Sequence, residues 1–167
     1  MAKGVIYPSN FEFKIGFDLI REQCVALCTM QHARDLLLSE EFSTNRVEIE
    51  RRHALAEEMR QILLSEREAP TEEFYDIADI IDKAKVEGTF LEVSEVVQLG
   101  KALISAGDFV QFLHKSNAEQ YPTLTTLAKP VKALWNIVAD IRRIVDDKGA
   151  VRDGASEELR QIRQQIR

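Results

Sequence analysis

Two cysteines and a histidine have a spacing that can serve metal binding. Cys24, Cys28 and His32 fall at i, i+4 and i+8, so one unbroken helix would place three zinc-type ligands on one face. Thr29, however, has the character of a helix N-cap, which predicts a break in that helix near Cys28. The sequence shows no fourth ligand, and small cysteines are often buried in helical cores. We therefore interpret these residues as structural and predict no metal site.

The many acidic side chains are not accompanied by a catalytic motif. Asp79 and Asp82, for example, have no neighbouring base, metal motif or phosphate-binding loop in the sequence. The patterns GxxxxGK[ST], GxSxG and HExxH are all missing. We therefore predict no catalytic and no cofactor-binding residue, so that these 167 residues are not themselves an enzyme.

Three arginines near the end of the chain have the spacing of a basic edge on a helix. Arg160, Arg163 and Arg167 fall at i, i+3 and i+7 beside an apolar stripe of leucine and isoleucine. Such an edge can face the phosphates of a nucleic acid. It can also be the rim of a buried stripe, with the alkyl parts of the arginines packed against it. These are the only residues that we predict to bind nucleic acid, and both interpretations stay open.

The overall composition is not that of a nucleic-acid-binding domain. The net charge is −6 and the isoelectric point is about 5.2, although residues 140–167 hold seven Lys and Arg against six Asp and Glu. Two cysteines do not form a disulfide framework. No signal peptide is recognisable, and no run of residues resembles a membrane span. We expect a cytoplasmic protein that does not enter a membrane.

Apolar residues recur with helical spacing, and no segment alternates as a strand does. This pattern predicts an all-α fold, an irregular bundle of about eight helices.

Ser43 and Asn45 with Glu48 form a capping-box pattern before a helix at 45–66. A second long helix at 92–115 contains two glycines, so it either bends or is closely approached by another helix. Pro130 is expected to start a further helix. The buried side of the helix at 45–66 is predicted to consist of Val47, Ile49, Leu55, Met59, Ile62 and Leu63.

The last residues have the signals of a helix start but no signal of a helix end. Gly149, Asp153 and Gly154 are turn residues, either Ser156 or Asp153 is the candidate N-cap, and acidic residues follow in the first turn. No Gly or Pro ends this helix before Arg167. We therefore expect a helical core domain at 1–153 and the truncated start of a longer helix at 154–167, in a fragment of a larger protein.

The sequence also resembles the MutS superfamily, in particular its bacterial paralogue branch with a C-terminal Smr nuclease domain. Each motif is short, but together and in this order they are fairly specific to that branch. The motifs are YPxNFExKIGFDxIR at 7–21, FST at 42–44, RQIL at 60–63, EGT at 87–89 and DxxGxVxDxASxELxxIR at 146–163.

The resemblance implies a helical core followed by the start of a lever helix. The ATPase domain with its ATP and Mg²⁺ site, the clamp and the Smr nuclease would then lie outside this chain. Members of the family form homodimers through the ATPase domain and bind mismatched or branched DNA, with roles in DNA repair and in suppressing recombination. A role on stalled ribosomes, and hence contact with rRNA, is also attributed to the branch.

Mismatch reading is not carried over to this chain. Mismatch-reading members place a Phe two residues before a Glu in a separate domain, and the run Phe11-Glu12-Phe13 lacks that spacing. Two alternatives to the MutS-like segment remain. One is a stand-alone helical module that binds a partner helix in a groove, and the other is a small helical enzyme that uses scattered acids.

Overall fold

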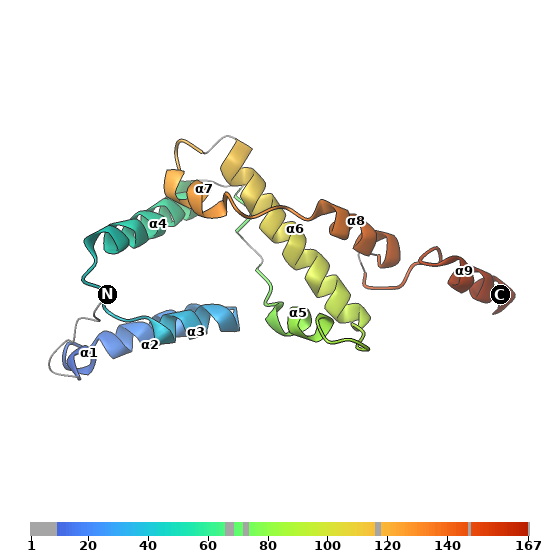
Figure 1. The fold of residues 1–167 in the computed structure, drawn as a ribbon, viewed down its shortest axis with the longest axis horizontal. Helices are drawn as coiled ribbons and strands as arrows, with labels where there is room; N and C mark the ends of the chain where they lie inside the picture. The colour runs from blue at the N-terminus through green and yellow to red at the C-terminus, as the bar shows by residue number, and fades with distance from the viewer. Residues whose placement is uncertain (1–9, 66–68, 72–73, 116–117, 147, 167) are drawn as a thin grey trace.

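The computed structural model describes residues 10–65, 69–71, 74–115, 118–146 and 148–166, and this part of the chain is all-α (Figure 1). The expected fold class is thereby confirmed, with nine helices among the described residues. Their bounds are α1 Phe11–Lys14, α2 Phe17–Leu27, α3 Gln31–Ser39, α4 Arg46–Ser65, α5 Ala78–Ala84, α6 Val93–Lys115, α7 Pro122–Ala128, α8 Trp135–Ile144 and α9 Glu157–Ile166.

Helices α1, α2 and α3 form a unit of their own at the N-terminal end (Figure 1). The ring of Phe42, after α3, packs against Phe11 and Phe17, with centroid distances of 5.7 and 5.4 Å. The guanidinium of Arg21 lies 5.3 Å from the Phe17 ring centroid. It also donates hydrogen bonds to the carbonyl oxygen of Leu37 at 2.6 Å and to Glu12 at 2.7 Å. Arg21 thus holds α1, α2 and the end of α3 together.

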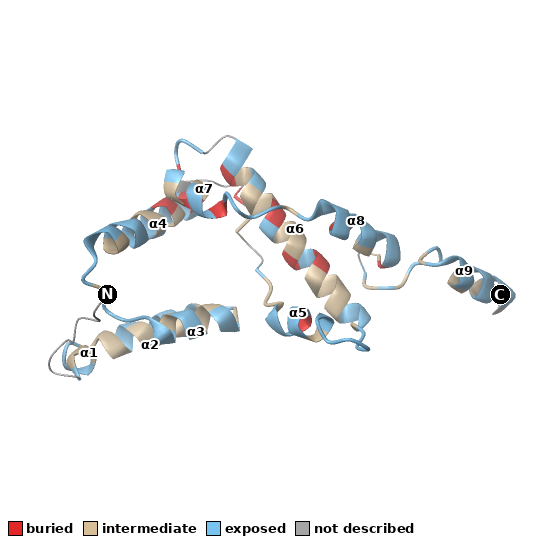
Figure 2. Cartoon of the chain, viewed as in Figure 1, coloured by how far each residue is buried: buried red, intermediate tan, exposed pale blue. Residues whose placement is uncertain are grey.

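The hydrophobic core lies where α4, α6 and α7 meet, and the buried residues gather there and along α6 (Figure 2). Ile62 from α4, Leu113 from α6 and Tyr121 before α7 are fully buried. The buried carboxylate of Glu58 accepts hydrogen bonds from the backbone nitrogens of Thr123 and Leu124, at 3.0 and 2.8 Å. Because the first N–H groups of a helix have no partner within it, Glu58 caps α7 from α4.

Helix α8 approaches α6 closely at the two glycines of α6. A Cβ atom at Gly107 would lie 2.8 Å from the Trp135 ring, and one at Gly100 would lie 3.1 Å from Ile141. Of the two alternatives for these glycines, the close approach of another helix is therefore the correct one.

Local capping signals in the sequence are largely confirmed. Asn45 Oδ1 accepts a hydrogen bond from the backbone nitrogen of Glu48 at 3.3 Å at the start of α4. The capping box is not completed, because the Glu48 side chain pairs with Arg51 and Arg52 instead. The predicted break near Cys28 is also confirmed, since α2 ends at Leu27 and α3 begins at Gln31.

Three expectations about the helices are wrong. Val47 and Leu63, predicted to be buried in α4, are 75% and 61% exposed, because no described helix covers those faces. Pro130 does not start a helix, and α8 begins only at Trp135. Thr29 does not cap α3, whose N-cap position is Met30 and whose first N–H group is bound by a distant carboxylate, that of Asp76.

Helix α6 also corrects the expectation that no run resembles a membrane span. Its length and composition are those of a helix that can cross a bilayer. Core helices of water-soluble proteins share these properties, and α7 and α8 pack against α6 as neighbours do in such a core.

Candidate nucleic-acid interface on helix α9

A short hairpin connects α8 to α9 and sets where α9 begins. Val145 and Val151 form an antiparallel bridge, and the backbone nitrogen of Arg152 donates to the carbonyl oxygen of Ile144 at 2.9 Å. Asp146 Oδ1 accepts hydrogen bonds from two backbone nitrogens within the turn, at 2.9 and 2.8 Å. Gly149 has a φ of 80°, which L-residues with side chains rarely adopt. The turn chemistry of this stretch therefore produces a defined hairpin.

Helix α9 starts as its sequence predicts. Ser156 Oγ accepts a hydrogen bond from the backbone nitrogen of Leu159 at 3.1 Å, so Ser156 is the N-cap. Glu157 and Glu158 lie in the first turn, where the positive end of the helix dipole favours negative charge.

Arg160 and Arg163 lie on neighbouring positions of α9 but have different partners. Arg160 is exposed and pairs with Glu157 at 2.9 Å, within its own helix. Arg163 is partly buried, pairs with Asp153 and donates a hydrogen bond to the carbonyl oxygen of Val151 at 3.1 Å. Arg163 thus joins α9 to the hairpin, whereas Arg160 presents its guanidinium at the surface.

The third predicted arginine, Arg167, lies outside the described residues, so the three are not brought together in the described structure. In the described part of the stripe beside them, Ile162 is exposed, and α9 packs against no other described helix. The role of Asp153 as a partner of Arg163 was not foreseen. The Asp-Gly turn signal was present in the sequence, but it gave no indication of a pair ten residues away.

The cysteines and the histidine do not form a cluster in the described structure. Cys24 lies in α2, Cys28 follows the end of α2, and His32 lies in α3 beyond the turn. Among the described residues, no group of three or more His, Cys, Asp or Glu side chains has the geometry of a metal site.

Curated relatives match nearly the whole chain. A protein named endonuclease MutS2 from Bacillus cytotoxicus is 26% identical over 155 residues, which is 92% of this chain and 20% of that protein. One of the same name from Symbiobacterium thermophilum is 26% identical over 153 residues, or 92% of this chain and 19% of that protein. A third, from Geobacillus sp., is 35% identical over 98 residues, or 56% of this chain and 12% of that protein.

The chain therefore spans about a fifth of the length of the relatives that match it most completely. No family profile matches the chain. These relatives belong to the group of proteins that the short motifs of the sequence resemble. The chain is thus similar along 92% of its length to proteins named endonuclease MutS2.

Proposed function

We propose that this chain is the helical core and the first part of the lever helix of a MutS2-like DNA-binding protein. The observation that carries the proposal is the similarity to MutS2 proteins along 92% of the chain. In this proposal the chain performs no chemistry. It positions α9, and through α9 it connects the core to the parts of the protein that contact DNA.

The geometry around α9 supports a mechanical role. The hairpin between α8 and α9 is held by the Val145–Val151 bridge and by the Asp146 side chain. Arg163 then binds α9 back to the hairpin through Val151 and Asp153. If the first turns of a helix are held firmly against a core, a rotation of the core also moves the far end of that helix. This is the property that a lever requires.

The activities of the full-length protein follow from the same proposal. We propose that it forms a homodimer, binds ATP and Mg²⁺ in a domain outside this chain, and binds mismatched or branched DNA. An Smr-type endonuclease activity would act on that DNA, in repair or in the suppression of recombination. A role on stalled ribosomes is the alternative for the full-length protein, and it would replace DNA by rRNA as the ligand.

A stand-alone interaction module is the alternative for this chain. It would use the groove between α6 and α8, which is lined by Val97, Gly100, Ile104 and Val138 among others. The volume of this groove is about 190 Å³. Small-molecule pockets usually measure about 300–1,000 Å³, so this groove is smaller than a usual ligand pocket.

The salt dependence of DNA binding by the full-length protein tests the proposed role of the arginines. Replacing Arg160, Arg163 and Arg167 with Gln should weaken binding to all sequences alike, because phosphate contacts do not read bases. The slope of log K against log salt should become shallower by about 0.9 for each lost phosphate contact. A matched control with the same change in charge replaces three exposed arginines of α4 with Gln: Arg46, Arg51 and Arg60.

If the slope of log K against log salt is unchanged, these arginines do not contact DNA phosphates. The role of α9 would then be mechanical only. No measurable DNA or RNA binding by the full-length protein would contradict the proposed function as a whole. Calorimetry with ATP gives an independent check. The 167-residue chain should not bind the nucleotide, because its sequence has no phosphate-binding loop.

A further inference from the structure

Cys24 and Cys28 lie one turn apart at the end of α2, and the proposed function makes no use of their thiols. Cys24 is in the last turn of the helix and is exposed, whereas Cys28 follows the last helical residue and is half-buried. The Sγ atom of Cys28 donates a hydrogen bond to the carbonyl oxygen of Cys24 at 3.3 Å. The thiol of Cys28 is therefore turned back along the helix toward Cys24.

Helix geometry brings the two side chains close to the separation that a disulfide needs. Residues at i and i+4 of a helix have Cβ atoms about 5–6 Å apart, whereas the Cβ atoms of a disulfide are about 3.5–4.5 Å apart. A movement of about 1–2 Å by one residue closes this difference. Inside a regular helix, such a movement would disturb the hydrogen bonds on both sides of the residue.

The backbone at Cys28 permits this movement because the helix ends before it. Cys28 has an extended backbone with a ψ of 128°, and its nitrogen donates to the carbonyl oxygen of Val25 at 3.1 Å, in a tightened last turn. Residues 28–30 are not helical and form a short link to α3. The carbonyl oxygen of Cys28 accepts a hydrogen bond from Arg34 Nε at 3.0 Å, and this long side chain can follow the movement. Cys28 can thus approach Cys24 while α2 stays intact.

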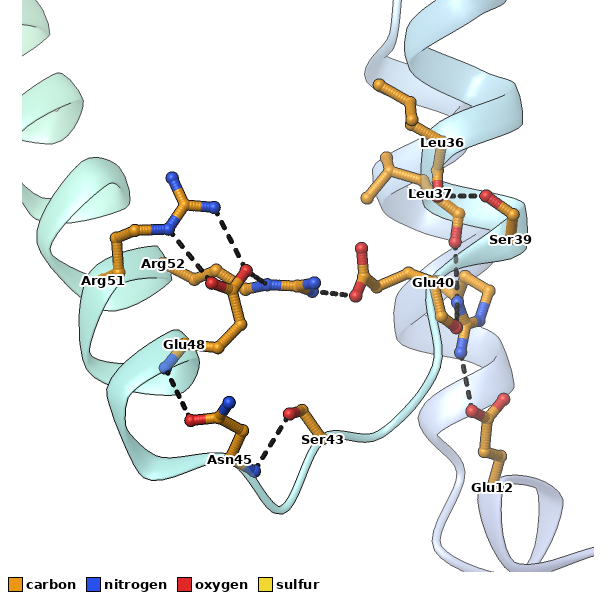
Figure 3. A network of polar contacts seen from close by, with 11 residues as sticks. Glu12, Leu36, Leu37, Ser39, Glu40, Ser43, Asn45, Glu48, Arg51 and Arg52 are labelled. Carbon is orange, nitrogen blue, oxygen red and sulfur yellow. Dashed lines mark hydrogen bonds and ion pairs between the residues drawn. The ribbon is translucent and has the colours of Figure 1, made fainter. Parts of the chain in front are cut away.

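A small oxidant can reach Cys24 from solvent in the described structure. Within the described residues, no helix from outside the unit of α1, α2 and α3 packs along α2. The unit joins later elements through polar contacts that involve neither thiol. Glu40 pairs with Arg52 of α4 (Figure 3), and the backbone nitrogen of Gln31 donates to Asp76 at 2.8 Å. An accessible thiol beside a second thiol is the arrangement found in redox-sensing cysteines.

We infer that Cys24 and Cys28 form a reversible disulfide with each other when hydrogen peroxide oxidises them. The sulfur of Cys24 attacks one oxygen of the peroxide, the O–O bond breaks, and Cys24 becomes a sulfenic acid while one water is released. The sulfur of Cys28 then attacks the sulfur of Cys24 and the S–O bond breaks. The released hydroxyl takes the proton of the Cys28 thiol and leaves as a second water. The two thiols lose two electrons, and the peroxide gains them.

Reduction of this disulfide needs only a small thiol such as glutathione. One glutathione thiolate attacks a sulfur of the disulfide and forms a mixed disulfide. A second glutathione then releases the protein thiol and leaves as glutathione disulfide. Exposed disulfides are of the labile kind that this exchange reverses. The inference goes beyond the proposed function and does not depend on it, because it concerns only the chemistry of residues 24–28.

The test follows the tryptic peptide 22–34 of the full-length protein, which contains both cysteines of the chain. The protein is equilibrated with mixtures of reduced and oxidised glutathione, the remaining thiols are blocked by alkylation, and the peptide is identified by mass spectrometry. The disulfide form carries no alkyl group and is two hydrogen atoms lighter than the dithiol. The ratio of the two forms across the mixtures gives the equilibrium constant of the pair.

The matched control moves one cysteine by two positions, in the double variant Cys28→Ser with Ala26→Cys. Position 26 is exposed on the same helix, but residues at i and i+2 do not face each other. Each constant is divided by that of the same variant unfolded in guanidinium chloride, which removes the effect of the different spacing along the chain. The normalised constant of the natural pair should exceed that of the control by at least about tenfold.

Treatment with hydrogen peroxide tests the order of the two steps. In Cys28→Ser, the sulfenic acid on Cys24 has no thiol to react with, so dimedone should trap it. In Cys24→Ser, dimedone should trap less sulfenic acid, because Cys28 is less exposed than Cys24. The unmodified protein should give the disulfide peptide instead of the dimedone adduct. Oxidation of Met30 in the same peptide adds an oxygen and is distinguished by mass.

Four results would overturn the inference. Equal normalised constants for the natural and control pairs would mean that the end of α2 does not favour this disulfide. Glutathione held on Cys24, or a disulfide from Cys24 to a cysteine elsewhere, would mean that Cys28 is not its partner. A pair that stays reduced in the folded protein but oxidises after unfolding would show that the fold prevents the bond. Dimedone trapped on Cys28 and not on Cys24 would contradict the proposed attack by Cys24.

Discussion

The Oε2 atom of Glu58, in α4, lies 2.8 Å from the backbone nitrogen of Leu124 in the first turn of α7, although 66 residues separate them. This buried carboxylate performs the task that a local Ser, Thr, Asp or Asn performs at other helix starts. It joins the two helices on either side of the core cluster. The contact therefore fixes both the start of α7 and its position on α4.

Replacing Glu58 with Ala should lower the free energy of unfolding by about 1–3 kcal/mol, because the buried N–H group of Leu124 and the partly buried N–H group of Thr123 would lose their acceptor. Urea denaturation followed by circular dichroism measures this change. Glu50→Ala, which removes an exposed ion pair with Arg46, is the control and should cost about 0.5 kcal/mol or less. Equal effects of the two variants would contradict the capping role of Glu58.

The close approach at Gly107 predicts a change that tryptophan fluorescence can detect. Trp135 is the only tryptophan of the chain, and a Cβ at position 107 would lie 2.8 Å from its ring. Gly107→Ala should push the indole outward into water and shift its emission to longer wavelength. Gly100→Ala is the control, because its Cβ would contact Ile141 at 3.1 Å instead. An unshifted spectrum for Gly107→Ala would show that α8 does not lie this close to α6.

The carboxylate of Asp76 connects the starts of α3 and α5. Hydrogen bonds from the backbone nitrogens of Ala78 and Gln31 hold the pKa of Asp76 below its ordinary value of 3.8, with further contributions from His32. Because the pKa is lower in the folded state, the unfolded state binds more protons in acid. The contribution of Asp76 to stability is therefore present above pH 3.8 and is lost as the pH falls through the lowered pKa.

Asp76→Asn should accordingly flatten the acid limb of a plot of unfolding free energy against pH. Asn keeps an oxygen that can cap a helix, but it does not titrate. Asp79→Asn removes the same charge from an exposed position in α5 and serves as the control. An acid limb equally steep in Asp76→Asn and in the unmodified protein would show that these hydrogen bonds do not form.

The link between α9 and the hairpin predicts a local change in amide hydrogen exchange. Arg163→Gln removes the ion pair with Asp153 and the hydrogen bond to Val151, so the amides of α9 should exchange faster while those of α8 stay unchanged. Arg160→Gln removes only a pair within α9 and should have a smaller effect. Exchange in α9 that responds equally to both variants would argue against Arg163 as the anchor.

The sequence by itself determined the features that depend on neighbouring residues. Helix periodicity, the Asn45 and Ser156 caps and the break after Leu27 were all predicted correctly, because each depends on groups within a few residues of one another. The turn at Gly149 was predicted for the same reason, since a positive φ is a property of one residue. The family resemblance was also available at this level, because it rests on short motifs in a fixed order.

Only the tertiary structure decided which helix faces are covered and which distant groups meet. The caps from Asp76 to Gln31 and from Glu58 to Leu124 span 45 and 66 residues, and no local pattern indicates such partners. The same holds for Val47, an apolar residue in a correctly predicted helix that nevertheless remains exposed. The physical reason is that periodicity shows that a helix has an apolar face, whereas burial requires another surface to pack against that face.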